Sequence, residues 1–416
     1  MGSCKTETKQ VTNKNDYNDY LELAQNKTLQ HAESNKEFWM DKYQKHPNQL
    51  TYLSKIASSY SHLFATTGII DYLKQAESDL LEVNAITHYK NPGSLMGLAG
   101  NYISQHKFKE ALDMLTKAEL IGDHLSDIQK MMFDVHLELG NYDVAKTYLE
   151  KLENMGDFDY LIRLAKWNDH QGNLDAAIKY LEKAKVIAES SKQKGIMHWT
   201  YTNLADFYGH AGRVEESYKL YLRALELNPN DAYSKKGIAW IAYSYEKNPD
   251  EALRILNTVT QTYRAPDYYL LKSQIYEFKG DAEAMDDQLK LYKEAVKNPM
   301  YGDMYNMYNV ILYNHENENL DEAIAIAKIE VANRPTPISY DLLAWSYFNN
   351  GNLDEALKIV KTHIIGHTSH PLTLLHCAEI LKAAGDLEKS NEIKKELEEN
   401  NLYELGPVVA EEVGRL

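Results

Sequence analysis

The chain has 416 residues, of which 44% are hydrophobic and 25% charged, a composition ordinary for a soluble folded protein. Its formal net charge of −16 argues against nucleic acid as a partner, because phosphate contacts need clustered Lys and Arg. Two cysteines, Cys4 and Cys377, are too few and too far apart for a disulfide framework or a cysteine zinc site. Low counts of Gly (20) and Pro (10) favour helices.

The chain begins M-G-S-C and continues into a polar stretch, so residues 1–16 are predicted to be a disordered tether. Three interpretations of this start stay open. A Cys after a small residue and before a polar stretch resembles the start of a mature bacterial lipoprotein, with Cys4 lipidated and the protein at the cell envelope. Gly2 and Thr6 also fit the N-myristoylation pattern M-G-x-x-x-[ST]. The third interpretation is a cloning remnant with an incidental Cys, which leaves the protein cytoplasmic.

Residues 17–53 are predicted to form an N-terminal helical cap. The sequence reads as helical from Tyr17 to about Lys45, and Trp39 and Pro47 stand near its end.

A pattern with a period close to 34 residues begins after this cap and is clearest between Gly212 and Pro229. Each period has a turn residue, usually Gly, and a small residue five positions later. Ten such periods can be followed, and the four clearest pairs are Gly140 with Ala145, Gly172 with Ala177, Gly212 with Ser217, and Gly351 with Ala356. A period in the low thirties is typical of a helix-turn-helix solenoid.

Each position of the pattern has a physical reason. Gly lets the chain take a positive φ between two helices, and a small residue lets two helix backbones approach closely. The polar and acidic residues after the turn, such as Asn173 and Asp175, suit the first turn of the second helix. Recurring Leu-Ala pairs followed by Tyr, as at Leu204, Ala205 and Tyr208, share one face of a helix.

These residues resemble the tetratricopeptide repeat (TPR) family. The unit from about residue 198 to 231 matches its pattern best, through Tyr201, Leu204, Ala205, Tyr208, Gly212, Ser217, Tyr221, Ala224 and Pro229. The resemblance covers roughly residues 54–404 and implies an all-α, right-handed α-solenoid of about ten helix-turn-helix units. Trp240 departs from the pattern, because it occupies a position that is normally small.

The C-terminal end is predicted in two parts. The highly charged stretch from Glu388 to Asn400 fits the polar capping helix that solenoids need. Residues 405–416 are predicted to be a loose tail, in which Val408, Val409 and Val413 have the character to dock a last helix.

None of the common catalytic motifs is present. The sequence has no phosphate-binding G-x-x-x-x-G-K-[ST], no H-E-x-x-H and no G-x-S-x-G. We therefore expect a non-enzymatic protein without a cofactor.

The TPR resemblance implies that function lies on a concave groove lined by the first helix of each unit. The positions that the family directs into this groove are Lys166, Asp169, His170, Trp199, Thr202, Asp206, His210, Tyr245, Tyr305, Tyr308, His315, Asp341 and Trp345. Aromatic residues with a few polar groups are what binding hot spots use. We expect this acidic, aromatic groove to bind a protein or peptide partner with basic or apolar side chains.

Two alternatives use the same residues. Asp169, His170, Asp206 and His210 have a spacing that could bring several ligands to one metal ion, in a metal-binding protein or metal-dependent enzyme. Trp199, Tyr308 and Trp345 could instead stack on a glycan in a carbohydrate-binding protein.

Overall fold

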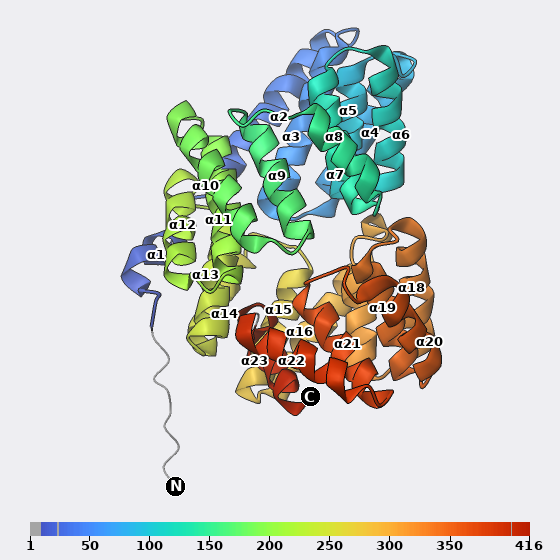
Figure 1. The fold of residues 1–416 in the computed structure, drawn as a ribbon. Helices are drawn as coiled ribbons and strands as arrows, with labels where there is room; N and C mark the ends of the chain where they lie inside the picture. Colours follow the sequence, from blue (N-terminus) through green and yellow to red (C-terminus); the bar gives the residue numbers. More distant parts are fainter. Residues whose placement is uncertain (1–9, 23–24, 401) are drawn as a thin grey trace.

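The structure is a computed structural model that describes residues 10–22, 25–400 and 402–416 (Figure 1). In this part of the chain the secondary structure is helical throughout. The elements are α1 (Lys14–Leu21), α2 (Lys27–Lys45), α3 (Leu50–Thr67), α4 (Ile70–Ile86), α5 (Pro92–Ser104), α6 (Phe108–Ile121), α7 (Leu125–Glu138), α8 (Tyr142–Lys151), α9 (Phe158–His170), α10 (Leu174–Ser191), α11 (Lys194–His210), α12 (Val214–Leu227), α13 (Ala232–Trp240), the π-helix η1 (Ile241–Tyr245), α14 (Pro249–Val259), α15 (Asp267–Lys279), α16 (Ala282–Val296), the 3-10 helix η2 (Pro299–Tyr301), α17 (Asn306–Glu316), α18 (Leu320–Asn333), α19 (Pro337–Asn349), α20 (Leu353–Ile359), the π-helix η3 (Val360–Ile364), α21 (Pro371–Ala383), α22 (Leu387–Asn400) and α23 (Leu402–Arg415).

From α3 to α22 the helices form ten successive pairs, and each pair packs against the one before it. The predicted all-α solenoid of about ten units is therefore confirmed. The first unit begins at Leu50, with α3, rather than at residue 54. In the predicted cap, α2 packs on α3 through Trp39, Met40 and Tyr43.

The turn inside each unit explains the recurring Gly. Gly140 and Gly351 have φ values of +72° and +80°, in the left-handed region that costs a side chain strain. The small residues five positions later, Ala145 and Ala356, are fully buried between the paired helices. Larger side chains there would push the two backbones apart.

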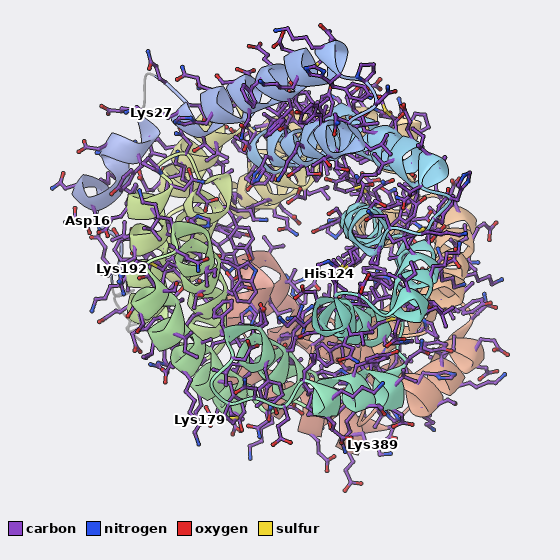
Figure 2. All side chains as sticks on the ribbon, turned by 90° about the horizontal axis from the view of Figure 1, so that it is seen from above. Asp16, Lys27, His124, Lys179, Lys192 and Lys389 are labelled. Carbon is purple, nitrogen blue, oxygen red and sulfur yellow. The ribbon has the colours of Figure 1, made fainter. Side chains whose placement is uncertain are left out.

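The solenoid winds back onto itself. Seen from above, the helices surround a central opening (Figure 2), and the later helices α17 to α22 lie below the earlier helices α3 to α9 (Figure 1). We call residues 25–259 the upper circuit and the described residues of 260–416 the lower circuit. The turns inside the upper units face the loops between the lower units.

Three kinds of contact join the two circuits. The Arg264 N–H donates to the Thr67 carbonyl at 2.7 Å. Arg334 Nη1 lies 3.5 Å from Glu138 Oε2, which comes 196 residues earlier in the chain. Apolar contact adds to these, because Ile70 and Leu73 of α4 share a buried cluster with tyrosines of the lower circuit, Tyr292, Tyr301 and Tyr305.

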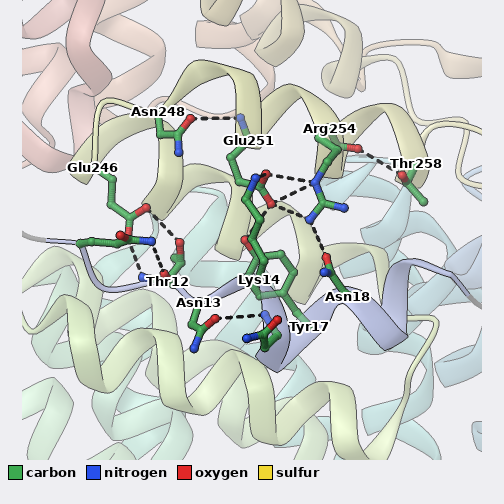
Figure 3. A network of polar contacts seen from close by, with 12 residues as sticks. Thr12, Asn13, Lys14, Tyr17, Asn18, Glu246, Asn248, Glu251, Arg254 and Thr258 are labelled. Atoms are coloured by element: carbon green, nitrogen blue, oxygen red, sulfur yellow. Dashed lines mark hydrogen bonds and ion pairs between the residues drawn. The ribbon is translucent and has the colours of Figure 1, made fainter.

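The N-terminal segment differs from the predicted tether. Residues 10–13 contain no helix and α1 follows them. This segment docks on α12, on α14 and on Glu246, which directly follows η1 (Figure 3). Thr12 is 4% exposed and Tyr17 is 1% exposed. The prediction was wrong over residues 10–16 because a polar sequence can be ordered by buried carboxylates at a distant site. Residues 1–9, with the Cys4 of the lipidation hypothesis, lie outside the described residues.

The C-terminal segment differs from the predicted loose tail, because residues 402–415 form α23. Val413 is 1% exposed and shares a cluster with Leu374 and Leu375 of α21. Gly406 lies against Trp240, so closely that a Cβ there would be 3.0 Å from the indole. Trp240, the large residue at a normally small TPR position, therefore supports the docking of α23. Among the described residues, no helix is both long and apolar enough to cross a membrane.

Candidate binding cavity between the two circuits

A cavity of about 1000 Å³ lies between the two circuits. The upper circuit lines it with the ends of first helices and the turns that follow them, and the lower circuit lines it with inter-unit loops and the start of α23. Its principal polar and aromatic side chains are His106, Glu138, Tyr142, Lys166, Asp169, His170, His210, Tyr308, Glu330, Arg334, His370 and Glu404.

Five of the thirteen predicted groove residues line this cavity, namely Lys166, Asp169, His170, His210 and Tyr308. Lys166 Nζ lies 3.5 Å from Asp134 Oδ1, on the preceding unit. The His170 ring lies over Tyr142, with 4.1 Å between ring centroids. These residues come from the C-terminal half of α9 and α11 and from α17, where the helices approach the opposite circuit.

One carboxyl group of the lining, that of Glu404, has an unusual environment. Glu404 Oε1, from the start of α23, lies 3.9 Å from His210 Nδ1 on α11. Burial and, to a smaller extent, the nearby charge of Asp169 together raise the pKa of Glu404 to about 7. Burial also raises the pKa of Asp169. The ionised forms of both carboxyl groups are therefore poorly solvated, and a bound cation would stabilise them.

Four of the histidines that line the cavity have lowered pKa values. Burial lowers the pKa of His210 to about 4, with a further contribution from His370. Burial is also the main cause that lowers the pKa of His106, His170 and His370. The histidines therefore add hydrogen-bonding capacity without offsetting the carboxylates.

Acidic side chains outnumber basic ones in the lining. Its basic residues are Lys166 and Arg334, and its acidic residues are Glu138, Asp169, Asp175, Asp303, Glu330, Glu396, Glu399 and Glu404. Both basic side chains are held in ion pairs, because Arg334 also lies 3.1 Å from Glu330 Oε2. The cavity is consequently suited to positively charged groups.

Four of the remaining predicted residues stabilise the fold. Asp206 accepts hydrogen bonds from the hydroxyls of Tyr221 and Tyr233. Asp341 is 3% exposed and accepts from Thr373 Oγ1 at 3.0 Å, with His376 Nδ1 3.1 Å away. Thr202 donates its hydroxyl to backbone carbonyls of its own helix. Tyr305 lies in the buried tyrosine cluster that joins the circuits.

The other four lie outside the cavity lining. Trp345 stacks on His376 at 4.1 Å, and Tyr245 meets Tyr403 edge-on at 6.5 Å. His315 Nε2 lies 3.9 Å from Glu277 Oε1. Trp199 is 39% exposed and has an edge contact with Phe158. Of the three aromatic residues in the carbohydrate hypothesis, only Tyr308 lines the cavity.

The metal hypothesis receives no support from the arrangement of side chains. Within residues 10–22, 25–400 and 402–416, no three His, Cys, Asp or Glu side chains are grouped as metal ligands. Asp206, one of the four proposed ligands, is held by two tyrosine hydroxyls instead.

Several cavity residues were not predicted, among them His106, Glu138, Arg334, His370 and Glu404. They stand at turns, at inter-unit loops or at the ends of helices, which become a binding surface only because the circuits stack. One signal was present in the sequence. His106 replaces the usual turn Gly and adopts a φ of +60°, which is strained for a residue with a side chain.

Comparison with known proteins gives a consistent family. The tetratricopeptide repeat family matches residues 130–192 and 200–231. No curated protein matches the sequence. Solved structures to which this chain is similar include yeast Tom70, at 11% identity over 86% of this chain and 91% of that chain, with a TM-score of 0.37.

Two further solved structures are similar at this level. A tetratricopeptide repeat protein from Parabacteroides merdae has 17% identity over 62% of this chain and 97% of that chain, with a TM-score of 0.36. A human IFIT1 dimer with m7Gppp-AAAA has 14% identity over 75% of this chain and 71% of that chain, with a TM-score of 0.47. Residues 130–192 and 200–231 are therefore tetratricopeptide repeats, and the helix-turn-helix units before and after them continue the same all-α architecture from α3 to α22.

Proposed function

We propose that this protein is a non-enzymatic scaffold that binds a basic segment of a protein or peptide partner in the cavity between the two circuits. Solenoid repeats characteristically present extended surfaces for binding. The observation that carries the proposal is the excess of carboxylates around a cavity of about 1000 Å³. Tyr142 and Tyr308 add apolar area with polar tips beside these charges.

The electrostatics favour a Lys or Arg side chain of the partner near Glu404. The ionised form of a buried carboxyl group with a raised pKa is strongly stabilised by a bound cation, because the cation offsets the free-energy cost of ionisation. Asp169 acts on the same ligand group, since its charge already acts on Glu404. A preformed cavity also lowers the ordering cost of binding.

The test is calorimetric titration with short peptides of equal length that are rich in Lys and Arg, neutral, or rich in Glu. We expect measurable binding of the basic peptide only. Asp169→Asn with Glu404→Gln should weaken that binding at least about tenfold, since each lost charge pair is worth about 1 kcal/mol or more. Asp113→Asn is the matched control, because Asp113 pairs with Lys117 on the exposed face of α6.

Two results would contradict the proposal: equal binding of the acidic peptide, or an equal loss of affinity in the Asp113→Asn control. The circular dichroism melting curve of each variant excludes unfolding as the cause. Because both carboxyl groups are destabilised by burial, the double variant should be at least as stable as the parent protein.

We further propose that the protein is bacterial and is attached peripherally to a membrane of the cell envelope through a lipid on Cys4. The support is the sequence pattern around Cys4 alone. Metabolic labelling with a radioactive fatty acid in a bacterial host tests it. Label on the parent chain and none on Cys4→Ser is expected, and label that persists on Cys4→Ser contradicts the proposal.

A further inference from the structure

The N-terminal segment is held like a bound peptide. Residues 10–22 lie outside the ring of helices, where Figure 2 places Asp16, and their partners come more than 200 residues later in the chain. Figure 3 shows partners at Glu246, which directly follows η1, and at Glu251 and Arg254 of α14. Tyr218 of α12 is a further partner. The site is independent of the cavity between the circuits.

Glu246 recognises the backbone of the extended part of the segment. Its Oε1 accepts from the N–H groups of Val11 at 2.6 Å and Thr12 at 2.5 Å. Its Oε2 accepts from Thr12 Oγ1 at 2.9 Å. One carboxylate thus accepts hydrogen bonds from two successive amides and a hydroxyl. The amide contacts would be available to any peptide sequence, whereas the third contact requires a hydroxyl.

The local backbone positions Glu246 for this contact. The π-helix η1 ends at Tyr245, and the Glu246 N–H donates to the Ile241 carbonyl across the wider π turn. Single π turns within helices are frequently found at functional sites. Lys247, the next residue, has a φ of +54°, so the chain reverses directly after Glu246.

Glu251 recognises the helical part of the segment. Its side chain is 2% exposed, and Lys14 Nζ lies 2.7 Å from Oε2. Tyr17 donates its hydroxyl to Oε1 at 2.8 Å. Lys14 and Tyr17 are three residues apart and therefore share one face of α1. Tyr17 also fills the core beside α12 and α14.

Two further contacts fix the register. Tyr218 accepts from the Asn13 N–H at 3.1 Å and lies 3.0 Å from Asp16 Oδ2. Arg254 Nη2 donates to Asn18 Oδ1 at 2.7 Å and to Glu251 Oε1 at 2.6 Å, while Nε donates to both carboxylate oxygens of Glu251. A shift of the segment by one residue would remove the Tyr17 and Lys14 contacts together.

We propose that the face formed by α12, η1 and α14 is a second peptide-recognition site, specific for the pattern Thr-x-Lys-x-x-Tyr and occupied in this chain by its own residues 10–22. The segment is a ligand in cis, whose local concentration keeps the site filled. A partner segment with the same pattern competes for the site.

The test uses the full chain with Thr12→Ala, Lys14→Ala and Tyr17→Ala, which leaves its own segment unable to dock. A fluorescein-labelled peptide of residues 10–22 is then titrated, and anisotropy reports binding. We expect the peptide to bind the triple variant saturably. Its binding to the wild-type chain should be at least tenfold weaker, because there the attached segment competes at an effective concentration on the order of millimolar.

Specificity is tested in the same triple variant by adding Glu246→Gln and Glu251→Gln, which should weaken peptide binding at least tenfold. Asp250→Asn is the matched control, because Asp250 lies between them, is 79% exposed and pairs with Lys279. If replacement of the buried Glu251 prevents folding, the variant with Glu246→Gln alone is tested instead.

Several outcomes overturn the proposal: no peptide binding at about 1 mM, equal binding to the Gln variants, or equal weakening by Asp250→Asn. Hydrogen exchange on the wild-type chain is an independent check, since the amides of Val11 and Thr12 should be protected. Docking in cis would also be overturned if the wild-type chain elutes as a dimer and the triple variant elutes as a monomer. That result would mean that the segment docks on a second copy of the chain.

Discussion

Tyr17 donates its hydroxyl to Glu251 at 2.8 Å, although 234 residues separate the two in the chain. Lys14 and Arg254 contact the same carboxylate, so the first helix is joined to the middle of the solenoid through one buried acidic group. This junction is the first place where the stability of the fold can be tested.

Glu251→Ala should lower the free energy of unfolding by about 3 kcal/mol, because it leaves Lys14, Tyr17 and Arg254 without their shared acceptor. Burial opposes ionisation of Glu251, but hydrogen bonds from Arg254, Lys14 and Tyr17 hold its pKa below the usual value. The stabilisation is therefore present at neutral pH and is lost as the pH falls through this lowered pKa. Urea denaturation at pH 7 and pH 3 measures both effects. A loss at pH 7 no larger than that of Asp250→Ala would contradict the assignment.

Gly140 and Gly351 provide a matched pair for the contact between the circuits. Both have positive φ, but a Cβ on Gly140 would lie 2.9 Å from the Pro335 carbonyl oxygen, whereas nothing lies within 4 Å of one on Gly351. Gly351→Ala should cost about 1 kcal/mol from backbone strain alone. Gly140→Ala should cost about 3 kcal/mol, since the circuits must also separate locally. Equal losses in denaturation experiments would mean that the contact contributes little.

Asp206 should behave as a structural residue. Asp206→Ala leaves the Tyr221 hydroxyl buried without an acceptor, which should cost about 2 kcal/mol. A double-mutant cycle of Asp206→Ala with Tyr221→Phe should give a coupling energy of about 1 kcal/mol or more. Thermal melts of the four proteins provide it. Additive effects would show that the hydroxyl is satisfied elsewhere.

Glu404 should make stability depend on pH. Its folded pKa of about 7 lies above the usual Glu value of about 4.3, so between these pH values the folded protein holds more protons than the unfolded chain. The free energy of unfolding should therefore fall as the pH rises through this window, by up to about 1.4 kcal/mol per pH unit.

Glu404→Gln should remove this contribution to the pH dependence. The difference in the free energy of unfolding between the variant and the wild type separates the contribution of Glu404 from that of other groups. His210 contributes with the opposite sign, because its pKa is lowered to about 4 and protonation below about pH 6.5 is destabilising. Chemical denaturation at half-unit steps from pH 4.5 to 8 gives the profile. A stability difference that does not change with pH would contradict the environment described for Glu404.

The local parts of the fold could be predicted from the sequence because their causes are local. A Gly such as Gly140 predicts the turn of one helix pair, and a small residue such as Ala145 predicts the close packing of its two helices. The stacking of the circuits has no such signal, since Glu138 meets Arg334 only after the small rotations between successive units have accumulated. Trp240 was noticed as a departure, but its partner Gly406 could not be identified without the superhelix.

The same difference separates the groove residues. Lys166, Asp169 and His170 lie at the end of a first helix, and the family pattern directs them toward the cavity that the structure contains. Asp206 has the same kind of position, but Tyr221 and Tyr233 from neighbouring helices occupy its carboxylate. A position within the repeat gives the direction of a side chain, whereas its partners depend on the residues of the next unit.

The stacked circuits have a consequence for how this array can evolve. Open repeat arrays gain or lose a unit with little penalty, because each unit touches only its neighbours. Here, duplication of one unit between Thr67 and Arg264 would move every later loop past its counterpart on the upper circuit. The Thr67–Arg264 and Glu138–Arg334 contacts would be lost together, and the cavity with them. The number of units is thus constrained by long-range register, as the number of strands is in a closed barrel.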